Sequence, residues 1–172
     1  PIVGLEPSCL LTLRDEFQTL LPGDEAKALA ENALLFEEFI AREARAGRFD
    51  LPMDSPGVSA RVHGHCHQKA AGVMTDMDTA LSLVPGLTPQ TIESSCCGMA
   101  GAFGYGADTY DVSIRMGELS LLPAVREAAA DDLIVANGTS CRHQISDGTG
   151  RHPLHIAEVF DRASLNALKD GV

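Results

Sequence analysis

Short apolar runs alternate along the chain with longer segments in which apolar residues recur every three or four positions. The short runs are predicted to be strands, at 2–5, 59–65, 88–93 and 132–136. Leu-Ile-Val-Ala at 133–136 is the run most typical of a buried strand. The longer segments are predicted to be helices, at 9–21, 24–47, 69–84, 108–121, 123–130, 140–146 and 153–168.

The alternation of strands and helices indicates the fold class. Strands separated by helical segments favour parallel pairing with right-handed crossovers. We therefore expect an α/β fold, a small layered domain with a mostly parallel sheet of about four strands flanked by helices. The 172 residues suffice for one such domain over 1–172. Because the chain opens directly in an apolar run without an initiator methionine, we expect it to be a piece of a longer polypeptide.

Composition and charge exclude several classes of partner. The chain is 45% hydrophobic, which is typical of a globular protein. Its 13 Lys and Arg against 24 Asp and Glu give a net charge of -11, which repels nucleic acid and anionic lipid alike. No apolar run reaches the roughly 18 residues needed to cross a bilayer, and no secretory signal is visible. A cytoplasmic protein without a transmembrane segment is expected.

The cysteines carry the main functional signal. Each predicted strand is followed within a few residues by one or two of them: Cys9, Cys66, Cys96, Cys97 and Cys141. Since the carboxyl ends of parallel strands share one edge of a sheet, these thiols are expected to converge there. Core packing is the alternative, but the surroundings His-Gly-His-Cys-His-Gln and Cys-Cys-Gly are not typical of a core. A disulfide framework is disfavoured by the odd number of cysteines and the missing signal.

A metal centre is the interpretation that uses all of these thiols. Each cysteine lies at or just before a predicted helix start, where the helix dipole favours thiolate. Several thiolates are stable together only if a cation joins them. Closed zinc sites usually use a Cys-x₂₋₄-Cys pair, which is absent, whereas the adjacent Cys96 and Cys97 suit an iron-sulfur cluster. Gly98 and Gly101 would let backbone N–H groups approach its sulfurs. A vicinal disulfide or a Cys-His nucleophile would leave most cysteines unexplained.

Four histidines lie near the cysteines in sequence. His63, His65 and His67 share one face if the strand stays extended, with Cys66 on the other. This favours hydrogen bonds to a cluster over direct ligation, with solvated histidines as the alternative. His143, two residues after Cys141, is a further candidate for either role, whereas His152 and His155 are expected to have none.

The cysteine pattern resembles the cysteine-rich CCG domain family. That family includes the CCG-bearing subunit of heterodisulfide reductase, the iron-sulfur subunit of glycolate oxidase, lactate-utilisation proteins and anaerobic glycerol-3-phosphate dehydrogenase. Cys66 is followed after 29 intervening residues by Cys96-Cys97-Gly98, and 43 residues separate Cys97 from Cys141. The fuller motifs resemble the C-terminal part of long FAD-linked oxidases of the D-lactate or D-2-hydroxyglutarate dehydrogenase type; they are Glu-Pro-Ser-Cys, His-Gly-His-Cys-His-Gln-Lys, Cys-Cys-Gly-Met-Ala-Gly-Ala-Phe-Gly-Tyr and Asn-Gly-Thr-Ser-Cys-Arg-His.

The resemblance implies a set of cluster ligands. They are Cys66, Cys96, Cys97 and Cys141, with Cys9 as a fifth. The closing Cys-x-x-Cys of the family is reduced here to one cysteine, with Gly138 three residues before it and Gln144 three after. The cluster type, 4Fe-4S or a non-cubane form, is therefore open, and Cys9 or a histidine is a candidate for the missing ligand.

The resemblance also implies a role. It indicates an electron-transfer domain of a flavin-dependent 2-hydroxy-acid dehydrogenase, with FAD and a ferredoxin-like region elsewhere in the parent chain. A quinone or a carrier protein would accept the electrons, and the parent could lie at the inner membrane face through its partners. The isolated fragment is not expected to turn over substrate. Two alternatives stay open: cluster-based thiol or disulfide redox catalysis as in heterodisulfide reductase, and a structural zinc or docking module.

Overall fold

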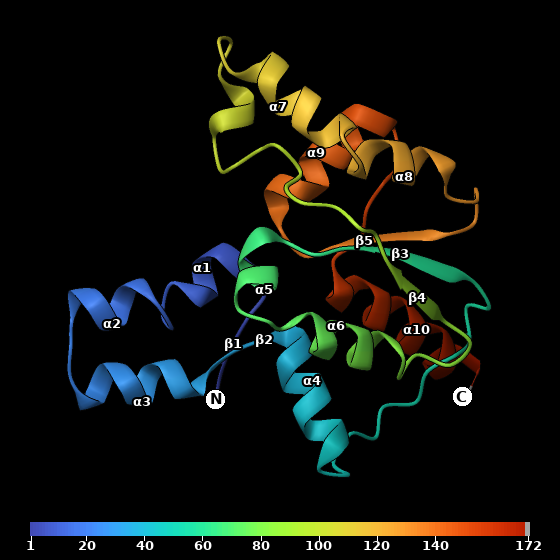
Figure 1. Ribbon diagram of the computed structural model, residues 1–172. Coiled ribbons are helices and arrows are strands. Elements are labelled where there is room, and N and C mark those ends of the chain that lie inside the picture. Colours follow the sequence, from blue (N-terminus) through green and yellow to red (C-terminus); the bar gives the residue numbers. More distant parts are fainter. Residues whose placement is uncertain (171–172) are drawn as a thin grey trace.

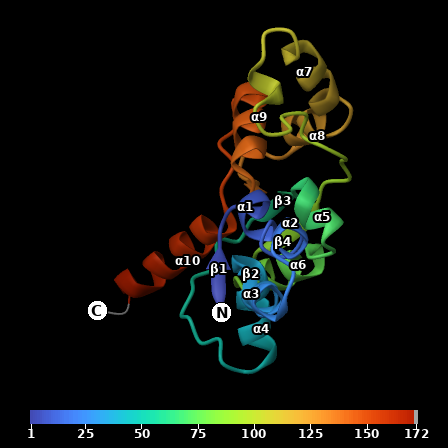
Figure 2. The ribbon, with the colours of Figure 1, turned by 90° about the vertical axis from the view of Figure 1, so that its left-hand side faces the viewer.

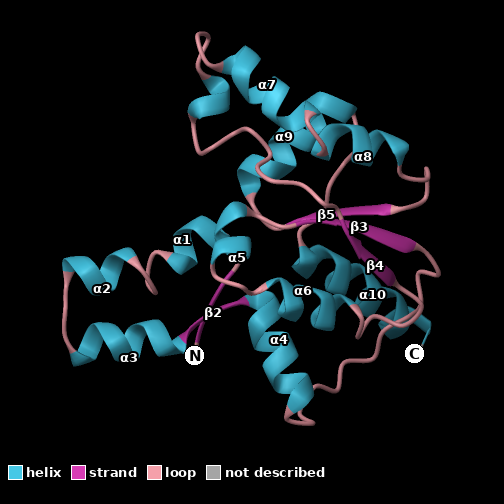
Figure 3. Ribbon diagram, in the orientation of Figure 1, coloured by secondary structure: helices cyan, strands magenta, loops and turns pink. Residues whose placement is uncertain are grey.

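The computed structural model describes residues 1–170 and contains two small parallel sheets surrounded by helices (Figures 1 and 3). The larger sheet has three strands in the order β4–β3–β5, formed by Thr88–Thr91, Ser59–His63 and Leu133–Ala136. The smaller one pairs β1, Ile2–Gly4, with β2, Ala33–Leu35. The predicted α/β class, with parallel strands flanked by helices, is confirmed. In place of a single sheet of about four strands, five strands divide between two sheets.

Helices cover both faces of the three-stranded sheet (Figure 2). Ala60 and Val62 of β3 face a layer that includes α4 (Phe36–Arg45), α6 (Met74–Leu81) and α10 (Ile156–Asp170). Ile134 and Ala136 of β5 face the opposite layer of α8 (Leu121–Glu127) and α9 (Thr139–Thr149), with α7 (Tyr110–Glu118) packed on those two helices. The carboxyl ends of β3, β4 and β5 are thus held at one edge between two apolar cores.

The region 24–47, expected to be one helix, contains a strand. It forms α3 (Asp24–Asn32), then β2, then α4. Ala33 and Leu35 are fully buried, and their segment pairs in register with Ile2–Gly4. The stripe of apolar residues is therefore not helical throughout, because tertiary pairing overrides the local period.

The segment 9–21 is also divided, into α1 (Pro7–Leu11) and α2 (Glu16–Leu20). Helices α2 and α3 run side by side and extend away from the rest of the molecule (Figure 1).

The remaining boundaries differ in smaller ways from the predicted ones. The predicted helix at 69–84 is divided into α5 (Cys66–Ala70) and α6. Strand β3 stops at His63, two residues before its predicted end. A short 3₁₀ helix, η1, covers Phe103–Tyr105. Within residues 1–170 no helix is both long and apolar enough to cross a membrane.

Candidate metal centre

Four of the five cysteines converge at the carboxyl edge of the three-stranded sheet. Cys66 begins α5 directly after β3, Cys96 and Cys97 follow β4, and Cys141 lies in the first turn of α9 after β5. The Sγ atoms of Cys66 and Cys96 are 3.7 Å apart. The sulfurs of Cys97 and Cys141 and one ring nitrogen of His63 lie within 4.8 Å of one another. Negative charge on any of the other three sulfurs would raise the pKa of the Cys141 thiol.

Cys9 occupies a different position. It is exposed on α1, which follows β1 of the smaller sheet and packs beside α5. In the described part of the chain, the cluster of possible metal donors contains His63, Cys97 and Cys141 but not Cys9. A ligand role for Cys9 stays a prediction without a contact to support it.

His63 is the histidine that faces the thiols. Its side chain is fully buried, and its Nδ1 lies 2.9 Å from the hydroxyl of Ser94. Its Nε2 is the one buried side-chain nitrogen or oxygen among the described residues without a hydrogen-bond partner. Burial lowers the pKa of His63, which favours the neutral ring.

The other histidines point elsewhere. Because β3 ends at His63, His65 becomes the residue before α5, and its Nδ1 accepts a hydrogen bond of 3.2 Å from the backbone N–H of His67. The rings of His65 and His67 stack at 5.1 Å. The common strand face expected for three histidines required an extended strand through His67, and that condition is not met because β3 ends at His63. His143 is exposed, and its Nδ1 lies 2.5 Å from the hydroxyl oxygen of Tyr105. His155 is buried with Nε2 2.9 Å from the carbonyl oxygen of Leu5, whereas His152 is exposed.

The loop before Cys96 is held by a lysine that sequence reasoning did not single out. The Nζ of Lys69 donates to the carbonyl oxygens of Ser94 and Ser95, at 2.5 and 2.8 Å. Lys69 lies three residues after Cys66 on α5, so the same short helix carries one thiol and fixes the loop of the next. The signal in the sequence that could have pointed to Lys69 is its place in the motif His-Gly-His-Cys-His-Gln-Lys, which contains Cys66.

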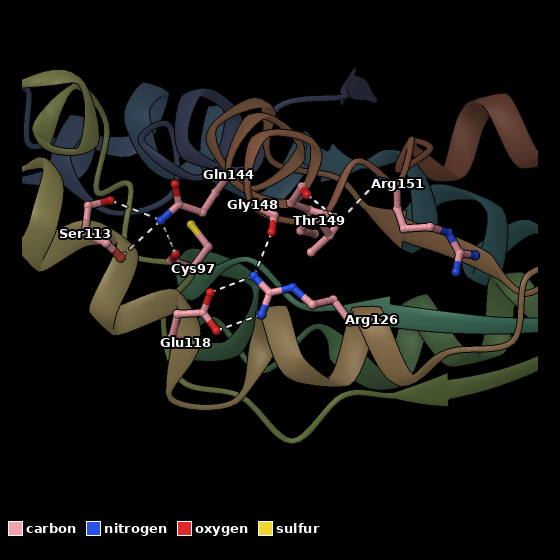
Figure 4. A network of polar contacts seen from close by, with 9 residues as sticks. Cys97, Ser113, Glu118, Arg126, Gln144, Gly148, Thr149 and Arg151 are labelled. Carbon is pink, nitrogen blue, oxygen red and sulfur yellow. Dashed lines mark hydrogen bonds and ion pairs between the residues drawn. The ribbon is translucent and has the colours of Figure 1, made fainter.

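Gln144 holds the backbone of Cys97 (Figure 4). Its side chain is buried, and its Nε2 donates to the carbonyl oxygen of Cys97 at 2.9 Å and to both Ser113 oxygens at 3.1 Å. Gln144, which lies three positions after Cys141, therefore links the Cys-Cys turn to α7. In the sequence, Gln144 is visible only as a departure from the Cys-x-x-Cys that the resemblance implies.

Gly98 is needed for the shape of this turn. Its φ is +98°, and its N–H points at the Sγ of Cys96 over 3.3 Å. A Cβ on Gly98 would lie 2.1 Å from the carbonyl oxygen of Ser113. Gly101 has a φ of +68° but no neighbour within 4 Å of such a Cβ. The structure thus places Gly98, and not Gly101, against a candidate ligand sulfur.

Three of these thiols, those of Cys66, Cys97 and Cys141, are electrostatically unequal. A hydrogen bond from Cys141 lowers the pKa of Cys97 to about 4, against the effect of burial and with help from His63. The same hydrogen bond and burial raise the pKa of Cys141. Burial and the hydrogen bond with Cys96 raise the pKa of Cys66 to about 11. Without a cation these shifts favour the thiolate at Cys97 and the thiol at Cys66 and Cys141, so deprotonation of all three requires bound positive charge.

The donors fit a metal centre with more than one ion. On a tetrahedral ion with metal–sulfur bonds of about 2.3 Å, two sulfurs lie about 3.8 Å apart. The separation of Cys66 and Cys96, 3.7 Å, matches that value. Together with Cys97, Cys141 and the unpaired nitrogen of His63 there are five donors, which exceeds the four of a single tetrahedral ion. An iron-sulfur cluster, which needs several soft ligands, fits this set.

Comparison with known proteins points to dehydrogenases. Over 159 residues the chain is 29% identical to one subunit of the anaerobic glycerol-3-phosphate dehydrogenase of Escherichia coli, a match that covers 91% of the chain and 39% of that subunit. It is 31% identical over 159 residues to D-2-hydroxyglutarate dehydrogenase of E. coli and 30% identical over 162 residues to that of Pseudomonas putida. These matches cover 90% and 92% of the chain and 15% of each enzyme.

The resemblance to glycerol-3-phosphate and D-2-hydroxyglutarate dehydrogenases is confirmed by these matches. No family model matches the chain, and no solved structure does. The chain spans less than half the length of these curated relatives, which are themselves dehydrogenases or parts of them.

Proposed function

We propose that this chain is an iron-sulfur-binding electron-transfer domain, of the CCG type, in a flavin-dependent 2-hydroxy-acid dehydrogenase. The observation that carries the proposal is the convergence of Cys66, Cys96, Cys97 and Cys141 from three loops at one sheet edge. The names of the similar proteins, dehydrogenases of glycerol 3-phosphate and of D-2-hydroxyglutarate, support the oxidoreductase context.

The residues of this chain would hold the centre and shield part of it. When bound, the cluster supplies one-electron transfer. Cys97 and Cys141 are buried and would anchor it, while Cys66 is exposed and would leave one side near the surface. The N–H of Gly98 would stabilise the Cys96 thiolate.

The rest of the reaction would take place outside this chain. Substrate would be oxidised at FAD in another region, and electrons would arrive through a ferredoxin-like region. A quinone or a carrier protein, reached at the inner membrane face, would take them on. The segment alone would therefore bind a cluster without oxidising hydroxy acids.

The test is the metal content of protein purified without oxygen. We expect iron and acid-labile sulfide in matching amounts per chain and an EPR signal that changes on addition of dithionite. The variant Cys141→Ser should lose most of the iron, whereas the exposed control Ser82→Ala, on the far end of α6, should keep it. Stoichiometric zinc in folded protein, with no cluster after reconstitution, would contradict the proposal and identify a structural zinc module.

The exposure of Cys66 favours a second candidate, thiol or disulfide chemistry at the centre. An exposed ligand gives sulfur substrates access to the metal, as implied by the resemblance to heterodisulfide reductase. Turnover of disulfides by the reconstituted protein would identify this activity. A cluster that resists displacement of Cys66 by added thiols would exclude it.

A further inference from the structure

We infer that His63 is itself a ligand of the centre, binding metal through Nε2 beside the sulfurs of Cys97 and Cys141. The inference rests on the proposed function in one respect, since it takes the resident centre to be iron-sulfur. It adds a nitrogen donor that the cysteine pattern does not contain.

The first argument is the unpaired nitrogen. The His63 side chain is fully buried, and its Nε2 has no partner in hydrogen-bond geometry among the described residues, although the ring helps to lower the pKa of the Cys97 thiol beside it. Leaving a buried polar atom unpaired is unfavourable, so native structures rarely retain one without a ligand or a functional role. A donor atom of this imidazole lies within 4.8 Å of the sulfurs of Cys97 and Cys141, which are the groups that a shared metal ion would bring together.

The second argument is the tautomer. The hydroxyl of Ser94 lies 3.4 Å from the carbonyl oxygen of Ile92, to which it donates, and its oxygen lies 2.9 Å from Nδ1 of His63. With its own hydrogen directed to Ile92, the Ser94 oxygen can accept the Nδ1–H once a metal ion takes the place of a proton at Nε2. The lone pair of the neutral ring is then on Nε2, where a metal can use it. Metal-binding histidines commonly have this arrangement, with the second nitrogen bonded to an oxygen that fixes the ring.

The third argument is rigidity. Lys69 binds the carbonyl oxygens of Ser94 and Ser95, so the acceptor for Nδ1 is held by the helix that also carries Cys66. His63 itself is the last residue of the central strand and pairs with Ala136 of β5. The ring is thus fixed at its backbone and at its far nitrogen before any metal binds.

Other histidines near the cysteines are not equivalent. His65 uses Nδ1 to accept from the His67 backbone, His67 is exposed and stacked on it, and His143 is bonded to the hydroxyl of Tyr105. His67 is therefore the matched control: it is four residues from His63, next to Cys66, and outside the donor cluster.

A pulsed EPR experiment on the reduced protein tests the inference without a variant. Protein reconstituted with iron and sulfide is prepared with natural histidine and with ¹⁵N-histidine. We expect a strong ¹⁴N coupling in the first sample, replaced by the corresponding ¹⁵N coupling in the second. The coupling should vanish in His63→Ala and persist in His67→Ala. A cluster signal without histidine coupling in the unmodified protein, or a coupling that survives in His63→Ala, would overturn the inference.

A second experiment, on protein loaded with cobalt(II) in place of iron, distinguishes failure of this inference from failure of the proposed function. X-ray absorption at the cobalt edge distinguishes nitrogen ligands at about 2.0–2.1 Å from sulfur ligands at about 2.3 Å. If no iron cluster assembles but bound cobalt has a nitrogen ligand that His63→Ala removes, the iron-sulfur proposal is wrong and the role of His63 stands. If bound cobalt has sulfur ligands alone, His63 is not a ligand. Protein that binds neither iron nor cobalt contradicts both.

Discussion

Gly98 is the single residue on which the shape of the Cys-Cys turn depends most. Its positive φ and the 2.1 Å approach of a Cβ to the Ser113 carbonyl oxygen both penalise any side chain. We expect Gly98→Ala to lower the free energy of unfolding by about 3 kcal/mol, the sum of backbone strain and overpacking. Urea unfolding measures this loss, and iron content should fall with it.

Gly101→Ala is the matched control for this prediction. Gly101 also has a positive φ, but its Cβ would meet nothing within 4 Å. The cost should be limited to about 1 kcal/mol of backbone strain. Equal losses in the two variants would mean that contact with Ser113 does not constrain the turn.

Glu37 is a buried carboxyl that links α4 to α5 and to the loop between β5 and α9. It accepts hydrogen bonds from the side-chain amides of Gln68 and Asn137, the latter at 3.0 Å. Burial is the largest cause of its raised pKa. Because the folded state holds this proton more tightly than the unfolded state does, the contribution of Glu37 to stability declines as pH rises from 4.5 towards its folded pKa.

We therefore predict a specific pH dependence for Glu37→Gln. The amide cannot ionise, so its stability deficit relative to the unmodified protein should narrow as pH rises above 4.5, by at most about 1.4 kcal/mol per pH unit. Denaturant unfolding between about pH 4.5 and 8 measures the difference. Glu31→Gln on exposed α3 should show no comparable trend. A deficit independent of pH would show that Glu37 is ionised throughout.

Among the elements, the start of α9 depends on a residue far away in sequence. The Glu6 carboxylate accepts the backbone N–H and the hydroxyl of Thr139 at 2.8 and 2.9 Å. Partial burial opposes ionisation, but these hydrogen bonds outweigh it and hold the pKa of Glu6 below its ordinary value. The helix that carries Cys141 is thereby joined to the start of α1.

Glu6→Gln should weaken this junction by about 1 kcal/mol, the usual loss when a helix loses a capping carboxylate. Amide hydrogen exchange should accelerate at Thr139 and in the first turn of α9. Ser8→Ala removes a hydrogen bond to the same carboxylate without touching α9, so its exchange there should stay close to that of the unmodified protein. Unchanged exchange in Glu6→Gln would contradict the link.

The elements also show what the sequence can predict. Strands β3, β4 and β5 are recognisable because each is a short run followed by a polar segment with a cysteine. Parallel pairing puts the carboxyl ends of these strands at one edge, so Cys66, Cys96, Cys97 and Cys141 could be placed together in advance. Strand β2 could not be found, since Ala33–Leu35 continues an apolar helical stripe and becomes a strand only through pairing with Ile2–Gly4.

The supporting contacts of the site were less predictable. Which histidine faces the thiols depends on where β3 ends, and the sequence does not mark His63 as its last residue. Gln144 and Ser113 meet through the packing of α7 on α9, a contact between residues 31 positions apart. Such contacts follow from tertiary packing, which local periodicity does not encode.

For the whole molecule, a bound centre would tie together three loops that are distant in sequence. We predict that removing the metal with a chelator lowers the midpoint of thermal unfolding. A ligand present at about 100 times its dissociation constant adds about 2.7 kcal/mol to the free energy of unfolding, and the chelator removes this contribution. Calorimetry with and without a chelator measures the shift. Cys141→Ser should abolish it.

Cys9→Ser is the matched control variant for the experiment with the chelator. Cys9 is a free thiol outside the cluster of donors, so its loss should leave the shift unchanged. A shift that disappears in Cys9→Ser would restore Cys9 as a ligand.

Exposure and acidity run in opposite directions for Cys97 and Cys66. Cys97, whose pKa is about 4, is 2% exposed, whereas the exposed Cys66 has a pKa raised to about 11. Alkylating reagents and peroxides attack the thiolate and need access to it. The metal-free protein therefore combines a shielded nucleophile with an accessible but protonated thiol. Cys66 and Cys97 should therefore both react slowly with such reagents and stay available for metal.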